Sequence, residues 1–375
     1  MNNPTHVATT RFQDFSLWNK IGDNRKLLSI GFDLTARCNH NCRHCYINLA
    51  PDDAAARDRE LTFGEIRRIA DEAVELGALW CTLTGGEPLL RPDFSDIYLM
   101  LKNKGLLISV FSNASLVTNR HVTLFREHPP RNLEVTVYGV TQETYERVTR
   151  VPGSFQAFTD GLNRLAAAGI KVTLKAMILK SNQHELPRIA QFCRPRTASP
   201  FRFDPHLHLR LDGNPVRNDD IRAERLSPER VAEIEQADAE RSEMLARTCD
   251  DLILPVQRRP PSGELLYCRA GKDSCHVSCD GMFQLCSSLT HPNCVADLRN
   301  VSLHDAWHTV PTRVLRMRSA DQSFLESCAI CRIVNLCLWC PAHAYLETGK
   351  TDGMVGYFCD VAHARAAALK SRCRC

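Results

Sequence analysis

Three cysteines near the N-terminus have the spacing of a metal-binding loop. They are Cys38, Cys42 and Cys45, in the pattern C-x3-C-x2-C, followed by Tyr46. Thiolates are the usual protein ligands of a 4Fe–4S cluster. Three thiolates for four irons leave one iron open to chelate the amino and carboxylate groups of a small molecule. For this segment alone, the alternative is a zinc site completed by His40 or His44.

Two further polar segments come directly after apolar ones. The first is Gly85-Gly86-Glu87-Pro88, in which two glycines allow a ligand to approach the backbone closely. Its peptide carbonyls and the Glu87 carboxylate are suited to accept hydrogen bonds from an ammonium group. The second is Ser112-Asn113, whose hydroxyl and amide suit a ribose or a carboxylate, although the same pair is common in turns.

A second group of cysteines lies towards the C-terminus. It comprises Cys268, then Gly281-x4-Cys286, then the run Cys328-x2-Cys331-x5-Cys337-x2-Cys340, and finally Cys359. A zinc ribbon is the alternative for the run Cys328–Cys340 taken alone. Of the other cysteines, Cys81, Cys193, Cys249 and Cys294 are expected to be structural or free, and Cys373 and Cys375 in the tail carry no assigned role.

The number of cysteines, 18 in 375 residues, bears on where the chain works. Its first residues are polar and lack the apolar core of a signal peptide, so we expect a cytoplasmic protein. Because the cytosol keeps thiols reduced, the cysteines favour metal binding or catalysis over a disulfide framework. The apolar runs are too short to predict a membrane span, and a formal charge of +4 with mixed signs predicts no nucleic-acid surface.

The chemistry-bearing segments need a scaffold that brings them together. Apolar segments alternate with amphipathic helical ones up to about residue 210, starting with a helix that has a capping box at Thr62 and Glu65. The six predicted strands are Leu27–Leu34, Leu79–Leu83, Leu106–Phe111, Leu133–Val137, Val172–Leu179 and Phe201–Leu209. This alternation predicts an α/β fold, with a parallel sheet curled into an incomplete barrel. In such barrels the reactive groups lie at the carboxyl ends of the strands, where the three N-terminal segments fall.

The chain is predicted to have four parts. Residues 1–26 form an N-terminal segment, residues 27–210 the barrel, residues 211–262 a polar linker, and residues 263–375 a small cysteine-rich domain. A helix in the linker is expected to start at Ser227-Pro228, with Ser as N-cap and Pro in the first turn. The cysteine-rich domain is expected to be rich in loops, because metal clusters would replace a hydrophobic core.

The order and placement of the N-terminal motifs resemble the radical S-adenosylmethionine (SAM) superfamily over about residues 27–210. The resemblance implies a partial (β/α)6 barrel in which Cys38, Cys42 and Cys45 hold a 4Fe–4S cluster whose open iron binds SAM. It further implies that SAM is cleaved to methionine and a 5′-deoxyadenosyl radical, which takes a hydrogen atom from the substrate. The residues expected to contact SAM are Tyr46, Gly85, Gly86, Glu87, Pro88, Ser112, Asn113 and Thr136.

The C-terminal cysteines resemble a SPASM domain, which usually binds two auxiliary 4Fe–4S clusters. The resemblance assigns Cys268, Cys286 and Cys340 to the first auxiliary cluster, with Cys275 or else Cys279 as fourth ligand. It assigns to the second auxiliary cluster Cys328, Cys331, Cys337 and Cys359. The pair Cys337 and Cys340 is separated by two residues, where relatives usually have three. Such saturated clusters suit electron transfer or substrate support rather than SAM binding.

Relatives with a SPASM domain mostly modify peptides or proteins, so the resemblance favours a peptide-modifying maturase. Only about 26 residues precede the first strand, too few for a winged-helix leader-recognition domain, so a separate leader-peptide recognition protein would fill that role. A low-potential electron donor such as flavodoxin or ferredoxin is the other expected partner. The sulfatase-maturing branch fits less well, because Ser287 follows Cys286 where those relatives have Asp.

Two alternatives of function remain from the sequence. One is a radical SAM enzyme that acts on a small molecule. The other, from a different class, is a non-catalytic iron–sulfur or zinc-binding module. The segment Gly85–Pro88 disfavours this second alternative, because such a module has no need for a SAM amine site.

Metal content tests the cluster assignment. Three 4Fe–4S clusters predict about twelve irons and about twelve sulfides per chain after anaerobic reconstitution. Iron, sulfide and zinc measured on one protein preparation check this expectation. Stoichiometric zinc with little iron would refute the assignment of clusters to these cysteines.

Overall fold

A computed structural model of the chain describes residues 26–247, 263–266 and 268–370. Its centre is a nine-stranded sheet in the order β6-β5-β4-β3-β2-β1-β7-β8-β9. All neighbours from β6 to β7 are parallel, and β8 and β9 continue antiparallel. The strands are β1 (Ser29–Thr35), β2 (Trp80–Gly85), β3 (Leu107–Ser112), β4 (Asn132–Val137), β5 (Thr173–Met177), β6 (Arg202–Asp204), β7 (Ser274–Val277), β8 (Met282–Gln284) and β9 (Ala296–Asp297).

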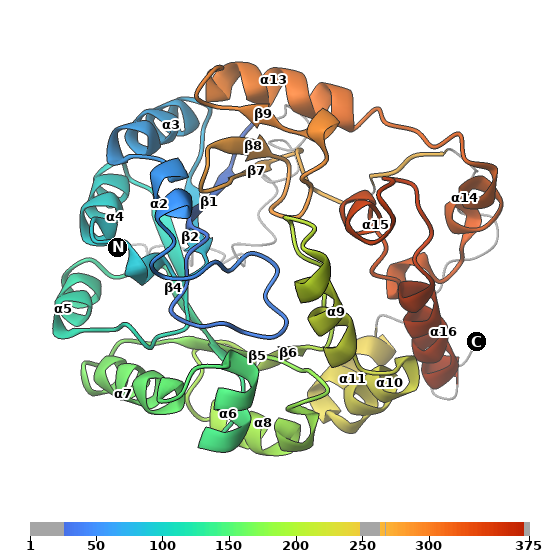
Figure 1. The fold of residues 1–375 in the computed structure, drawn as a ribbon, viewed down its shortest axis with the longest axis horizontal. Helices are drawn as coiled ribbons and strands as arrows, with labels where there is room; N and C mark the ends of the chain where they lie inside the picture. The colour runs from blue at the N-terminus through green and yellow to red at the C-terminus, as the bar shows by residue number, and fades with distance from the viewer. Residues whose placement is uncertain (1–25, 248–262, 267, 371–375) are drawn as a thin grey trace, which may run out of the picture.

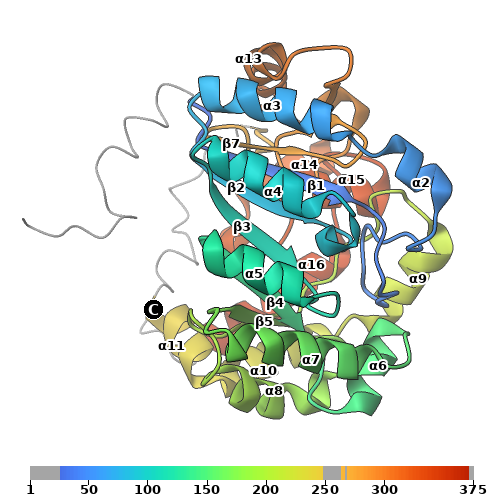
Figure 2. The same ribbon diagram turned by 90° about the vertical axis from the view of Figure 1, so that its left-hand side faces the viewer.

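Helices cover the outer side of the curled sheet (Figures 1 and 2). Those of the barrel are α2 (Ala54–Arg59), α3 (Phe63–Glu75), α4 (Phe94–Asn103), α5 (Asn119–Glu127), α6 (Gln142–Thr149), α7 (Ser154–Ala167) and α8 (Leu186–Cys193). Those that follow are α9 (Pro215–Glu224), α10 (Pro228–Ala237), α11 (Ala239–Arg247), α13 (Leu303–Val314), α14 (Gln322–Glu326), α15 (Pro341–Thr348) and α16 (Gly356–Lys370). None of the described helices is both long and apolar enough to cross a membrane.

The predicted incomplete α/β barrel is confirmed, and its helices start where the sequence signals lie. Thr62 Oγ1 accepts a hydrogen bond from the Glu65 amide, and the Glu65 carboxylate accepts one from the Thr62 amide at 2.7 Å. Ser227 likewise caps α10. The sixth strand is shorter than predicted, because the carboxylate of Asp204 accepts the amide of His206 (2.9 Å) and the chain leaves the sheet there.

The C-terminal part is more regular than the sequence predicted. It is rich in loops, as expected, but β7 also pairs with β1 and continues the barrel sheet. Helix α13 packs on α3, where the Leu303 amide donates to the Glu72 carboxylate, and α16 packs on α10. Figure 1 shows α14, α15 and α16 grouped on the far side of this sheet extension. The barrel and the C-terminal part share one sheet. The division of the chain into four parts stays a prediction.

Alternation along the strands separates an apolar outer layer from a polar interior. On β2, Cys81 and Leu83 belong to the core beneath the helices, whereas Thr82 and Thr84 line a central cavity. Cys193 and Cys294 are also fully buried, in agreement with the structural role expected for them. Cys249, Cys373 and Cys375 lie outside the described residues.

Gly161 on α7 tests how tightly the helices pack against the loops that carry the site. A Cβ at Gly161 would lie 2.0 Å from the carbonyl oxygen of Ala114, the second residue after Ser112. We expect Gly161→Ala to lower the free energy of unfolding by about 1–3 kcal/mol, because the backbone cannot yield without strain. Gly64→Ala, on α3 where only Thr62 Oγ1 lies nearby, should be neutral or stabilising. Urea unfolding of both variants checks this, and equal effects would contradict it.

Candidate functional site

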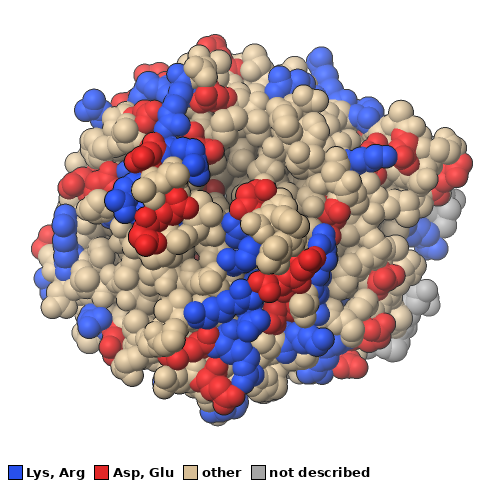
Figure 3. All heavy atoms as spheres, viewed as in Figure 1, with Lys and Arg blue, Asp and Glu red and all other residues tan. Residues whose placement is uncertain are grey.

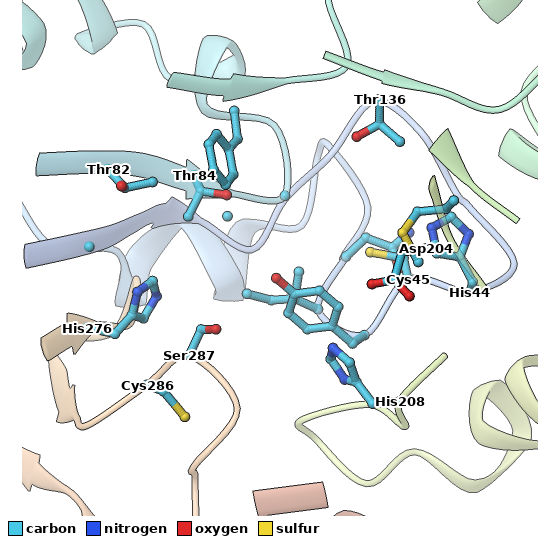
Figure 4. Close-up of a pocket in the computed structure, with 18 of the residues that line it drawn as sticks. His44, Cys45, Thr82, Thr84, Thr136, Asp204, His208, His276, Cys286 and Ser287 are labelled. Atoms are coloured by element: carbon cyan, nitrogen blue, oxygen red, sulfur yellow. The ribbon is translucent and has the colours of Figure 1, made fainter. Parts of the chain in front are cut away.

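A cavity of about 640 Å³ opens at the carboxyl ends of the barrel strands. It is visible as a hollow near the centre of the molecular face in Figure 3. The barrel contributes Cys38, Cys42 and Cys45 to its lining, and the C-terminal part contributes Cys286 and Ser287. In Figure 4, Cys45 and Cys286 approach the cavity from opposite sides. Residues from the two ends of the sequence thus share one site.

The three N-terminal cysteines lie together on the loop between β1 and α2. Burial raises the pKa of Cys38 well above its usual value, and the neighbouring Glu87, Cys42 and Cys45 raise it further. Burial also raises the pKa of Cys42. Thiolates in such surroundings require compensating cations, which the irons of a cluster supply. The His40 amide donates a hydrogen bond to Cys38 Sγ (3.3 Å), as suits a cluster ligand. The residues fit the expected cluster.

The zinc alternative finds no support among the described residues, because no three His, Cys, Asp or Glu side chains there converge to hold a single ion. The rings of His40 and His44 instead contact Tyr145 and Tyr138. Both ring nitrogens of His40 are buried without a hydrogen-bond partner. Burial lowers the pKa of His40 to about 4, so this ring is neutral.

Two arginines that the sequence analysis missed hold the cysteine loop in place. Arg210 donates to the carbonyl oxygen of Cys45 (3.3 Å), and Arg217 donates to that of Cys42 (3.1 Å). Both also reach Asn48, at 3.1 and 3.2 Å. Arg210 follows β6 and Arg217 lies on α9, in or beside the segment expected to be only a linker. Nothing in the sequence distinguishes these two arginines from solvated ones.

The segment Gly85–Pro88 lies directly against the cysteine loop. A Cβ on Gly85 would be 2.3 Å from the carbonyl oxygen of Thr35, and one on Gly86 equally close to that of Arg37. The glycines therefore allow close approach of protein backbone on this side. Glu87 is fully buried, and its carboxylate accepts hydrogen bonds from Leu89 N, Ser112 Oγ and Asn113 N. Burial raises the pKa of Glu87 to about 7.

The other residues expected to contact SAM fall into two groups. Tyr46, Gly85, Gly86, Ser112, Asn113 and Thr136 line the cavity. Glu87 and buried Pro88 lie behind its wall, where Glu87 joins the loops after β2 and β3. Asn113 also donates from Nδ2 to Asn39 (2.9 Å) and towards Cys38 Sγ (3.8 Å). The segments predicted from separate strands thus meet at the first cysteine.

The expected ligands of the first auxiliary cluster are brought together only in part. Burial raises the pKa of Cys286, and the neighbouring thiols of Cys340 and Cys268 raise it further. Cys340 caps α15, where its sulfur accepts the His343 amide at 3.4 Å. Cys275 on β7 is buried in the core beside Cys81 and also lines the cavity, but its thiol is not among those that raise the pKa of Cys286. Cys279 lies near Asp33 and Glu60.

The expected ligands of the second auxiliary cluster form a separate group. Burial raises the pKa of Cys337 to about 11, with further contributions from Cys359, Cys331 and Cys328. The amide of Trp339 donates to the Cys337 sulfur at 3.4 Å. Cys340 and Cys268 are thus neighbours of Cys286, whereas Cys359, Cys331 and Cys328 are neighbours of Cys337. The assignment of these cysteines to two auxiliary clusters stays a prediction.

Fold and site together define an incomplete-barrel enzyme with a three-thiol loop at its catalytic end. A family model described as the radical SAM superfamily matches residues 33–193, and one described as the SPASM iron–sulfur cluster-binding domain matches residues 268–332. The chain belongs to the radical SAM superfamily and carries a C-terminal SPASM iron–sulfur domain. It is therefore a radical SAM enzyme.

Relatives and solved structures span most of the chain. An AdoMet-dependent heme synthase of Methanosarcina barkeri is 25% identical over 338 residues, covering 85% of this chain and 93% of the relative. Streptococcus suis SuiB bound to the precursor peptide SuiA has a TM-score of 0.65 at 14% identity, covering 94% of this chain and 82% of SuiB. The enzyme anSMEcpe with bound AdoMet has a TM-score of 0.65 at 11% identity, covering 92% of this chain and 94% of anSMEcpe. At these identities the structural matches establish the fold.

The buried Glu87 offers a test of how the site is held together. Glutamine at this position keeps the shape but offers one acceptor oxygen to three donors, so Glu87→Gln should lower the free energy of unfolding by about 1–3 kcal/mol. SAM should bind at least about tenfold more weakly, because the loops after β2 and β3 are no longer fixed. Glu143→Gln on exposed α6 is the control. Calorimetry and urea unfolding measure both effects, and unchanged SAM affinity in the buried variant would argue against this role.

Proposed function

We propose that this enzyme cleaves SAM reductively at Cys38, Cys42 and Cys45 and abstracts a hydrogen atom from a substrate held in the central cavity. One observation carries the proposal: these three thiols and Cys286 of the first auxiliary group line the same cavity. The 4Fe–4S cluster, when bound and reduced, would supply one electron to the SAM sulfonium and so give methionine and a 5′-deoxyadenosyl radical.

The residues of the chain position this chemistry rather than perform it. Arg210 and Arg217 fix the carbonyl groups of the cysteine loop, and Asn113 directs its amide to Cys38. Gly85, Gly86 and Thr136 offer backbone and hydroxyl groups to SAM from the adjacent strand ends. Auxiliary clusters in the two C-terminal cysteine groups would accept an electron from the substrate radical. This outcome would allow net oxidation or cross-linking.

The substrate that we favour is a peptide or protein. The cavity opens to the surface, so a reacting side chain can enter while the rest of the substrate stays outside (Figure 3). Fold neighbours include SuiB with its precursor peptide and anSMEcpe with a bound peptide. We also propose a separate leader-recognition protein and a flavodoxin- or ferredoxin-like electron donor as partners.

A carboxylate-bearing small molecule is the second candidate. Lys175 and Arg269 both line the cavity and carry positive charge, and in the structure they pair with Glu134 (2.5 Å) and Asp273. The heme synthase relative, whose name indicates a small-molecule product, matches 85% of this chain. These two observations keep a tetrapyrrole or similar acid as the alternative substrate.

Replacement of the three cysteines tests the proposed function. The triple variant Cys38→Ala, Cys42→Ala and Cys45→Ala should lose 5′-deoxyadenosine formation with dithionite and SAM. It should keep its auxiliary clusters visible by spectroscopy, because their ligands lie on other elements. Persistent SAM cleavage in this variant would contradict the assignment.

The wild-type enzyme and the triple variant together distinguish a peptide substrate from a small-molecule substrate. Each is co-expressed with short peptides encoded beside its gene, and each is separately incubated with Fe-coproporphyrin III, an iron tetrapyrrole with carboxylate side chains that appears in the name of another relative. A mass change in a peptide, absent with the triple variant, supports the peptide substrate. Conversion of Fe-coproporphyrin III alone would overturn it in favour of the small molecule.

A further inference from the structure

His206 lies in the cavity wall just after β6 and is contacted by a residue from the far end of the chain. Its Nε2 is 2.5 Å from Nη2 of Arg365 on α16. The Arg365 guanidinium is itself fixed, since it donates to both carboxylate oxygens of Glu235 (2.8 and 2.6 Å) and to the carbonyl oxygen of Leu336 (2.9 Å). Both side chains of the Arg365–Glu235 pair are buried.

This contact determines which nitrogen of His206 carries the proton. A guanidinium group only donates hydrogen bonds, so Nε2 of His206 must accept with a lone pair. Burial lowers the pKa of His206 to about 2, and the cations Arg365 and Arg241 lower it as well. The imidazole is therefore neutral, and its single proton resides on Nδ1.

The Nδ1–H group is a donor without a partner. Nδ1 of His206 is buried and has no hydrogen-bond partner among the described residues. Buried donors in native proteins are nearly always paired, so an unpaired one in a cavity wall indicates a ligand that supplies the acceptor. The neighbouring Asp204 makes no hydrogen bond to Nδ1, and its Oδ1 accepts the backbone amide of His206.

We propose that His206, fixed by Arg365 as a neutral Nδ1–H donor, binds an oxygen acceptor of the substrate in the central cavity. The acceptor is a carbonyl oxygen if the substrate is a peptide, or a carboxylate oxygen if it is a small acid. This inference rests on the proposed function only in taking the cavity as the substrate site. Arg365 is the positioning residue and His206 the binding residue.

The contact between His206 and Arg365 also connects the cavity to the second group of C-terminal cysteines. Arg365 lies on the same helix as Cys359, and Leu336, whose carbonyl oxygen it holds, precedes Cys337. The helix that brings Cys359 to its group thus also sets the hydrogen-bond polarity of the cavity wall.

Nitrogen-15 NMR of reconstituted, histidine-labelled enzyme tests which ring nitrogen of His206 carries the proton. The His206 signal is assigned as the one that is absent from the spectrum of His206→Gln. The proton is expected on Nδ1. A proton on Nε2 would overturn the proposal, whatever the substrate. The Arg365→Lys variant keeps a donor and should preserve the Nδ1–H signal, whereas Arg365→Met should let the other tautomer appear.

Acetate and N-methylacetamide, titrated into the SAM-loaded enzyme, test what this donor binds. One of them should shift the Nδ1–H signal saturably, acetate indicating a carboxylate site and the amide a peptide site. His206→Asn keeps an N–H near the Nδ1 position and should bind the same probe within about threefold, whereas His206→Gln should lose about tenfold or more. Iron content and urea unfolding verify that both variants are folded.

Three results would overturn the inference: no shift with either probe, equal binding by the two variants, or loss of SAM affinity in His206→Gln. The last result would place the donor against SAM instead of the substrate. Because SAM cleavage without substrate depends on the cysteine loop, the inference can fail while cleavage persists. Failure of the proposed function would instead appear as loss of cleavage itself.

Discussion

The cysteine loop, with two buried thiols close to a buried carboxylate, forms the constraint on which the site depends. Thiolates at Cys38 and Cys42 are unfavourable where they lie, because burial and neighbouring acids both oppose their charge. A bound cluster would supply the missing positive charge, and backbone amides and Asn113 direct donors to the sulfur. Glu87 in turn joins the loops after β2 and β3. The local fold is thus organised for a group that the protein must acquire.

The C-terminal part participates in the same cavity rather than forming an appended module. Strand β7 pairs with β1, so the wall of the barrel continues into the segment that carries Cys286. From the other side, α16 reaches back through Arg365 to the cavity wall at His206. A substrate between these walls would be close to both the SAM site and the first auxiliary group. This arrangement suits an oxidation in which the electron leaves through the C-terminal part.

The barrel fold and the position of the cysteine loop were predictable from the sequence, for identifiable physical reasons. Strand and helix periodicity, capping residues and the order of motifs gave the barrel and placed the cysteine loop at its catalytic end. Residues that act through tertiary contacts were not predictable. Arg210 and Arg217 resemble solvated arginines in the sequence, and Cys275 resembles a ligand until the register of β7 turns it into the core. The pairing of β7 with β1 joins segments more than 200 residues apart and has no local signal.

We infer that the loop of Cys38, Cys42 and Cys45 holds a cluster with one iron open to SAM. Electron–nuclear double resonance of the reduced enzyme, with SAM carrying nitrogen-15 in its methionyl amino group, measures this contact. We expect a nitrogen-15 coupling to a reduced cluster, and this coupling should disappear when the three cysteines are replaced by alanine. A reduced cluster on this loop that shows no coupling to labelled SAM would contradict the claim.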